Sequence, residues 1–376
     1  MTAIRVAATH RDEPAAAADA LASELGGADV STVMFFSSFR YPFAELAGLI
    51  AERFGDALTV GCTTAGEIGP AGCTTGGISA VALSGPSRSR ATVVDLATFR
   101  FEDGEEIVRE LGEQLGTEIS PGRHVFLTLT DGLSGMEEIL IASLGTYAPG
   151  VRLVGGSAAD DWKFTETWVA ADGVAQKGAA VVILLEPGVP FHTFHLHHFE
   201  ATDTRVVVTE ADAQRRLVHE LDGRPAVETL ARHMGITVEQ LLGPTQHALP
   251  TFAFHVGDQY YMRSVMTVQE NSLLMGGAVE EGAILRLMSG LDLIEATRDG
   301  VRRAMDSVPG TPDGMILFNC AGRLVEAQLT DRVDALYDVM SPIPVAGFTT
   351  YGEQYGPMQV NHTLTGLVLG ADRRHG

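Results

Sequence analysis

Two short stretches of this sequence carry carboxylate and hydroxyl side chains in the same order and spacing. In 61–70 and again in 347–357, a Thr-Thr pair follows a glycine, and a glutamate comes three residues after the second threonine. The side chains concerned are Thr63, Thr64 and Glu67 in the first stretch and Thr349, Thr350 and Glu353 in the second. Carboxylates hold ammonium groups through charge-assisted hydrogen bonds, and exposed backbone N–H groups hold anions. The pattern therefore predicts a site for a small charged ligand.

A looser copy lies between these stretches, where Gly156 is followed by small residues and then by Asp160 and Asp161. Arg323 comes shortly after Cys320, and its guanidinium suits a bidentate contact with a carboxylate. We expect the acids of all three stretches to face one pocket, with Arg323 beside them. The alternative is that the acids only cap turns and that Arg323 neutralises them.

Two of the three cysteines, Cys62 and Cys320, follow strand-like runs, where a nucleophile could lie. A nucleophilic cysteine needs a nearby base and a lowered pKa, and the local sequence offers a partner to neither. A small buried thiol is the commoner role. The odd number and the spacing fit neither a disulfide framework nor a metal site, so we expect a reducing compartment.

The composition describes an acidic chain with enough apolar residues for a full core. Of 376 residues, 45% are hydrophobic, and 48 Asp and Glu face 26 Lys and Arg, for a net charge of −22. Nucleic acids and anionic membrane surfaces require a basic patch, so neither is an expected partner. The first ten residues lack a signal-peptide pattern, and no apolar run is long enough for a bilayer span. We expect a cytoplasmic protein.

The elements that would position these side chains alternate between strands and helices. Apolar runs at 57–60, 151–154 and 345–346 lead directly into the three glycine-containing stretches. We expect these loops to leave the ends of buried strands, where open α/β sheets bind ligands. The order strand, helix, strand, loop, strand occurs repeatedly. The fold class is therefore predicted as α/β, with mixed sheets built from repeated strand-helix-strand units in two domains.

Two further expectations concern strand pairing. The runs 78–83 and 91–96 lie on either side of a Gly-Pro turn, which predicts an antiparallel pair. The stretch 191–199 is predicted as one strand.

Four motifs together resemble the signature stretches of the FIST domain family. They are GCTTAGEI from Gly61, LVGGSAADD from Leu153, NCAGR from Asn319 and GFTTYGE from Gly347. The resemblance places a FIST N-terminal domain at 28–219 and a FIST C-terminal domain at 220–376, with its recognisable part ending near 356. It implies an intracellular bacterial sensory protein that binds a small ligand, such as an amino acid, between its two domains. A signalling protein such as a histidine kinase or a cyclic-dinucleotide enzyme would be its partner.

Two alternatives remain, one from the resemblance and one from the residues themselves. Some members of the family are haem-based nitric-oxide sensors, and His195 or His198 would then be the axial ligand. These residues belong to a histidine-rich stretch in which His195 and His197 would share one strand face. No third metal ligand is evident, so we expect no metal, and a polar strand face is the simpler role. The other alternative is an enzyme that uses Cys62 or an acidic pair.

Overall fold

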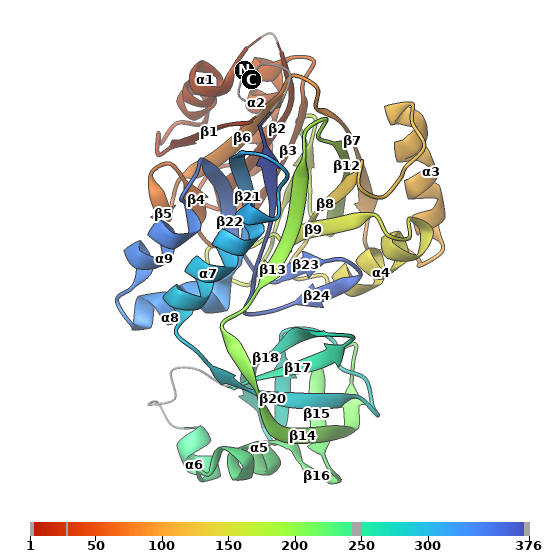
Figure 1. Ribbon diagram of the computed structural model, residues 1–376, viewed down its shortest axis with the longest axis vertical. Helices are drawn as coiled ribbons and strands as arrows, with labels where there is room; N and C mark the ends of the chain where they lie inside the picture. The colour runs from red at the N-terminus through yellow and green to blue at the C-terminus, as the bar shows by residue number, and fades with distance from the viewer. Residues whose placement is uncertain (1–3, 28, 243–249, 372–376) are drawn as a thin grey trace.

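The computed structural model describes residues 4–27, 29–242 and 250–371. Its chain forms three units of one topology and a β-barrel inserted into the third unit. In Figure 1 the three units form the upper body and the barrel lies below it. We call these parts the body and the barrel.

The first two units follow one another along the chain. The first contains β1 (Ile4–Thr9), α1 (Pro14–Leu25), β2 (Val30–Ser38), α2 (Phe43–Phe54), β3 (Leu58–Thr64), β4 (Glu67–Gly69), β5 (Gly72–Thr74) and β6 (Ile78–Ser84). The second contains β7 (Arg88–Asp95), α3 (Asp103–Leu115), β8 (Val125–Thr130), α4 (Glu137–Tyr147), β9 (Arg152–Ser157), β10 (Val169–Ala171), β11 (Val174–Gln176) and β12 (Ala179–Glu186).

The third unit begins before the barrel and ends after it. It contains β13 (Phe191–Leu196), α7 (Leu293–Asp306), β21 (Pro312–Cys320), α8 (Ala321–Leu329), α9 (Val333–Met340), β22 (Val345–Thr350), β23 (Glu353–Tyr355), β24 (Met358–Val360) and β25 (Leu364–Gly370). The barrel contains β14 (Phe199–Asp212), β15 (Leu217–Leu221), β16 (Arg224–Pro225), α5 (Ala226–Met234), α6 (Val238–Leu241), β17 (Thr251–Val256), β18 (Gln259–Gln269), β19 (Ser272–Met275) and β20 (Ile284–Gly290).

The three units exchange their short hairpins in a cycle. Each unit forms four strands of a six-stranded mixed sheet, and the last two strands come from another unit. The hairpin β10–β11 joins the sheet of the first unit, β23–β24 joins the second and β4–β5 joins the third. This exchange locks the three sheets together, because each hairpin continues a neighbour's hydrogen-bonded ladder.

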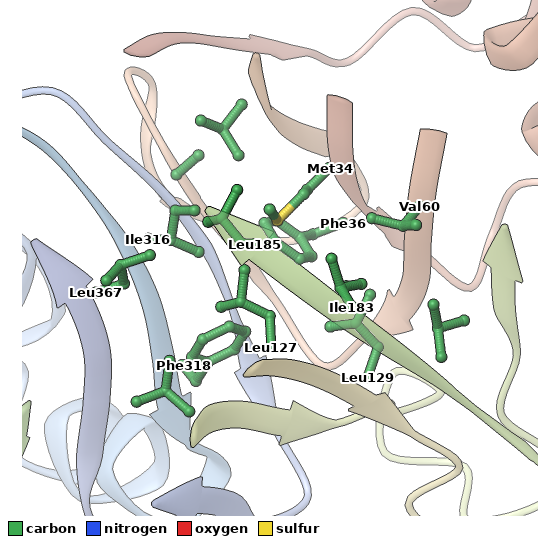
Figure 2. Close-up of a cluster of buried hydrophobic side chains, with 14 of the residues drawn as sticks. Met34, Phe36, Val60, Leu127, Leu129, Ile183, Leu185, Ile316, Phe318 and Leu367 are labelled. Carbon is green, nitrogen blue, oxygen red and sulfur yellow. The ribbon is translucent and has the colours of Figure 1, made fainter. Parts of the chain in front are cut away.

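One hydrophobic core lies where the three sheets face one another. Figure 2 shows Met34 and Phe36 of the first unit beside Leu185 of the second and Ile316 of the third. The opposite face of each sheet is covered by the helices of its own unit. Burial on both faces explains why strands such as β12 are continuous apolar runs rather than alternating ones.

The barrel is a closed sheet with the strand order β14-β20-β17-β18-β19-β15, in which β15 also pairs with β14. The helices α5 and α6 pack on its own hydrophobic cluster. The predicted division at residues 219 and 220 lies inside β15, so in space both predicted domains contribute to the barrel and to the body.

The fold class predicted from the sequence, mixed α/β sheets in repeated units, is confirmed. The expected pairing of 78–83 with 91–96 is wrong, because β6 lies in the first sheet and β7 in the second. The stretch 191–199 is not one strand either. It ends as β13 at Leu196, and β14 begins at Phe199, so His197 and His198 form the link into the barrel.

Candidate functional site

The three glycine-containing loops meet at the centre of the body. Each lies at the C-terminal end of a buried strand, β3, β9 or β22, as predicted, but its glycines and the residues after them, up to Thr64, Ser157 or Thr350, belong to the strand itself. Backbone hydrogen bonds join each loop to another. They run from Ala65 N to Thr349 O (3.0 Å), from Ala159 N to Thr63 O (2.9 Å) and from Tyr351 N to Ser157 O (3.1 Å). The loops therefore form one closed and buried ring.

Glu67 is buried inside the first loop, with 2% of its surface exposed. Its carboxyl group accepts hydrogen bonds from Thr64 Oγ1 (2.5 Å) and from the backbone N–H of Gly77 (2.9 Å). Burial raises the pKa of Glu67 to about 8. The Thr63 hydroxyl accepts a bond from the backbone N–H of Trp168.

Glu353 repeats this arrangement in the third unit. It is fully buried, it accepts a hydrogen bond from Thr350 Oγ1, and Thr363 donates to it from both its backbone N–H (3.2 Å) and its hydroxyl (2.7 Å). Burial raises the pKa of Glu353 to about 7. Thr349 is buried in the ring, and Gly156 of β9 lies opposite Glu353.

The two aspartates of the second loop also have internal partners. Asp160 is fully buried and accepts from the backbone N–H of Phe164 (2.8 Å) and from the Tyr351 hydroxyl (2.7 Å). Burial opposes its ionisation, but these bonds prevail and lower the pKa of Asp160. Asp161 accepts from Ser38 Oγ (2.8 Å). Glu67, Asp160 and Glu353 thus have both carboxyl oxygens hydrogen-bonded within the protein, and Asp161 has one. The contact of these acids with a ligand stays a prediction.

Arg323 is fully buried on α8, and its guanidinium faces the protein interior. Nε donates to Asn319 Oδ1 (2.9 Å), Nη2 donates to Thr297 Oγ1 (2.7 Å) and Nη1 contacts His198 Nδ1 (3.3 Å). Burial lowers the pKa of Arg323 to about 10, so it remains charged at neutral pH. The guanidinium N–H groups that were expected to hold a ligand carboxylate therefore already have partners within the protein.

His198, Glu326 and His362 form a cluster whose possible ligand atoms all lie within 4.8 Å of one another. His198 Nε2 is 2.8 Å and His362 Nε2 is 3.3 Å from Glu326 Oε2. Since Arg323 can only donate, His198 Nδ1 must accept, and the proton of the neutral ring is on Nε2. A metal or a haem iron would need that same Nε2 without its proton. The cluster therefore fits a hydrogen-bond network better than a metal or haem site.

His195, the other predicted haem ligand, lies between two tyrosine rings. Its ring centroid is 5.6 Å from that of Tyr261 and 4.6 Å from that of Tyr355. Its Nε2 is 3.4 Å from the Tyr260 carbonyl oxygen. The contact with the Tyr260 carbonyl occupies Nε2, and the two tyrosine rings restrict the approach of a planar haem to this side chain.

A cavity of about 530 Å³ lies between the body and the barrel. The barrel contributes residues of β18, β19 and the turn before β15, among them Arg216, Met266 and Met275. The body contributes the ends of its loops and one side of α8. The body side of the lining includes Trp162, Phe164, Val325, Glu326, Tyr351, Asn361 and His362. A cavity of this size suits a ligand larger than a free amino acid.

One wall of the cavity is aromatic. The rings of Phe164 and Tyr351 stack with centroids 4.6 Å apart, and the Trp162 ring lies 6.3 Å from that of Tyr351. Trp162 and Phe164 remain 37% and 54% exposed. Both have positive φ, at 66° and 52°, and so does His362 at 55°. Such backbone conformations are costly for residues with side chains and cluster at functional sites.

Two acceptor atoms of the cavity lining lack a hydrogen-bond partner within the described part of the chain. One is Oδ1 of Asn361, whose Nδ2 donates to the Gly276 carbonyl (3.2 Å). The other is Oε1 of Glu326, because both histidines contact its Oε2. Asn361 Oδ1 is fully buried, whereas the side chain of Glu326 is 28% exposed. Glu326 Oε1 is therefore the acceptor that a ligand in the cavity can reach.

Buried ion pairs fix the position of the barrel on the body. Arg216 of the barrel lies 2.9 Å from Glu137 and 3.5 Å from Glu138, at the start of α4. Arg263 lies 3.8 Å from Glu138. Burial raises the pKa of Glu137, although Arg216 opposes the shift. Because Arg216 also lines the cavity, these pairs hold one of its walls.

Of the predicted site residues, Cys320 is the one that lines this cavity. Burial raises the pKa of its thiol well above the usual range, and the same holds for Cys62. Both remain protonated at neutral pH, unlike an activated nucleophile. Two lining residues that we did not single out adjoin the predicted motifs, because Tyr351 follows Thr350 and Trp162 follows Asp161, whereas the lining residues of the barrel lie far from any motif.

No helix in the described ranges is both long and apolar enough to cross a bilayer.

Two family descriptions match the sequence next to each other. The FIST N domain matches residues 31–224, and the FIST C domain matches residues 226–356. Together they cover most of the chain and meet a few residues from the division predicted from the sequence.

Curated relatives share part of this sequence. The uncharacterized protein Rv0628c of Mycobacterium tuberculosis is 27% identical over 263 residues, which are 64% of this chain and 66% of the relative. The uncharacterized protein MJ1623 of Methanocaldococcus jannaschii is 26% identical over 151 residues, or 37% of this chain and 29% of the relative. The match thus spans slightly less than two thirds of Rv0628c.

Solved structures with some likeness include two cyanuric acid hydrolases. One has 11% sequence identity and a TM-score of 0.35, with 98% of this chain and 100% of the other covered. The second, from A. caulinodans, has 7% identity and a TM-score of 0.34, with 99% and 100% covered.

Proposed function

The chain belongs to the FIST family, whose domains are generally signal-transduction sensor domains, and on that premise we propose that it senses a small ligand bound between its barrel and its body. The observation that carries the proposal is the cavity of about 530 Å³ that both parts line. Clefts between domains are favoured sites for small ligands. A ligand there contacts both parts at once, so its binding changes how firmly they are held together.

The lining supports binding rather than catalysis. Its thiol, Cys320, is a protonated buried group, and its carboxylate, Glu326, is held by two histidines. The signal would pass to a signalling protein such as a histidine kinase or a cyclic-dinucleotide enzyme. The choice of partner rests on the family alone, whereas the proposed cytoplasmic location rests on the composition and the cysteine pattern as well.

A thermal-shift screen of a metabolite library tests the proposal. A ligand that binds only the folded state raises the melting temperature by mass action. We expect at least one compound to stabilise the native protein and not the Val325→Trp variant, because Val325 lines the cavity and a tryptophan there fills it. Leu329→Trp is the matched control, since Leu329 is 52% exposed at the end of the same helix, away from the cavity lining. Compounds that stabilise the native protein and both variants alike would refute the proposal, as would a screen without any hit.

A further inference from the structure

We propose that the ligand of this cavity is an organic amine, a cation with an aromatic or apolar body. This inference rests on the proposed function and adds the chemical class of the ligand. It follows from two features of the lining: an anionic carboxylate with one oxygen that lacks a partner, and an aromatic wall.

The carboxylate is that of Glu326, on the side of α8 that lines the cavity. Its side chain is 28% exposed, so a ligand can reach it. Burial opposes its ionisation, but hydrogen bonds from His198 and His362 hold the pKa of Glu326 well below its usual range. The group therefore carries a full negative charge at neutral pH. Both histidines use Oε2, which leaves Oε1 as an acceptor for an ammonium group.

The aromatic wall favours the same kind of ligand. The faces of aromatic rings are negative, and they attract organic cations within about 6 Å of the ring centre. Trp162 provides an exposed indole ring, and Phe164 and Tyr351 extend the wall as a stacked pair. The apolar side chains of Met266 and Val325 line the same cavity and suit the body of the ligand.

The remaining charges do not reverse this preference. Arg216 lines the cavity, but Glu137 and Glu138 compensate its charge. Arg215 lies in the same lining, but its side chain is exposed, so solvent and salt screen its attraction for a ligand carboxylate. The chain as a whole carries a net charge of −22, which attracts cations and repels anions over longer distances.

Calorimetric titration with three matched probes tests the class of the ligand. The three probes, tryptamine, tryptophan and indole-3-propionate, share an indole ring. Tryptamine carries an ammonium group, indole-3-propionate carries a carboxylate, and tryptophan carries both. We expect tryptamine to bind at least about 10-fold more tightly than indole-3-propionate, because one charge-assisted hydrogen bond is worth about that much. Tryptophan should bind less tightly than tryptamine.

Two variants locate the interaction. Glu326→Gln should weaken tryptamine binding about 10-fold or more, while Glu24→Gln, which removes the same charge from an exposed site on α1, should not. Phe164→Leu should weaken it several-fold, and Phe101→Leu, another exposed phenylalanine, should not. Unchanged melting temperatures show that the variants are folded.

The outcomes separate this inference from the proposed function. Tighter binding of tryptophan or indole-3-propionate, with loss of binding in Val325→Trp, overturns the amine class and leaves the sensor in place. The same conclusion follows if the compounds that stabilise the protein in the thermal-shift screen lack a basic nitrogen. Absence of any ligand that Val325→Trp excludes overturns both.

Discussion

Glu67 and Glu353 hold equivalent positions in two different sheets of the body. Each carboxyl group accepts a hydrogen bond from the threonine three residues earlier and from the backbone N–H of the residue ten positions later. Each follows a glycine with positive φ, Gly66 at 147° and Gly352 at 157°. The repeated motif in the sequence therefore encodes a buried carboxyl group that closes a loop between units.

The raised pKa of Glu67, about 8, predicts a pH dependence of stability. In the unfolded chain this carboxyl group has its ordinary pKa of 4.5, so between pH 4.5 and 8 the folded state binds more protons. The stabilisation that results from this difference is fully present below pH 4.5 and is lost as the pH rises through 8. Glu67→Gln mimics the protonated form. We compare the melting temperature of this variant with that of the native protein at each pH. The difference, variant minus native, should increase by on the order of 5 °C between pH 5 and pH 8.5.

Glu24→Gln is the control for this series, because Glu24 is exposed on α1. Its melting temperature should follow that of the native protein across the whole pH range. If Glu67→Gln also follows the native protein, the raised pKa is contradicted.

The loops themselves were predictable because their determinants are local. An apolar run followed by a glycine and a short polar segment predicts a strand and a turn, and β3, β9 and β22 lie where the apolar runs place them. Their ends lie three or four residues beyond the predicted ones, because each strand continues through its glycines to Thr64, Ser157 or Thr350. The exchange of hairpins was not predictable from hydrophobic patterning. The short strand β4 has the same pattern whether it pairs within its own unit or, as it does, with β22 of the third unit.

The candidate site was only partly predictable for a related reason. Arg323 is an arginine on a helix, a residue type that is mostly exposed, yet it is fully buried. Its partners His198 and Thr297 come from a strand link and another helix, which no sequence spacing relates to it. The cavity likewise combines loop ends of the body with strands of the barrel. Apart from Cys320, only those lining residues that lie beside a motif, such as Tyr351, were near a predicted position.

The ion pairs between barrel and body predict strong coupling. In a double-mutant cycle, Glu137→Gln and Arg216→Met should show a coupling energy of about 1–3 kcal/mol in urea unfolding, because the pair is largely buried. The exposed pair Glu106 and Arg109 on α3, treated in the same way, should give no more than about 1 kcal/mol. Equal coupling energies for the two pairs would show that burial does not strengthen the interdomain contact.

The buried guanidinium of Arg323 predicts that lysine cannot replace it. Arg323→Lys keeps the charge but leaves partners among Asn319, His198 and Thr297 unpaired, which should cost about 2–4 kcal/mol of unfolding free energy. Arg302→Lys on α7 is the matched control, since Arg302 is exposed and pairs with Asp299. Similar stabilities for both variants in urea would contradict the network.

The three thiols should react slowly in the folded protein. Burial raises the pKa of Cys73 to about 12 and places those of Cys62 and Cys320 above their usual range. At pH 7.5 we expect labelling by iodoacetamide to be at least about 100-fold slower in the native protein than in 8 M urea, because the thiolate is the reacting form. Rapid labelling of Cys320 in the native state would contradict this account and would reopen the enzyme alternative.

Recovery of a ligand from a metabolite extract tests the central claim most directly. The native protein, Val325→Trp and Leu329→Trp are each incubated with the extract, washed and denatured, and the released small molecules are identified by mass spectrometry. The account predicts a compound with a basic nitrogen that is released from the native protein and from Leu329→Trp, but not from Val325→Trp, in which the cavity is filled. Release of the same compounds from all three proteins, or of none from any, would contradict ligand binding between the barrel and the body.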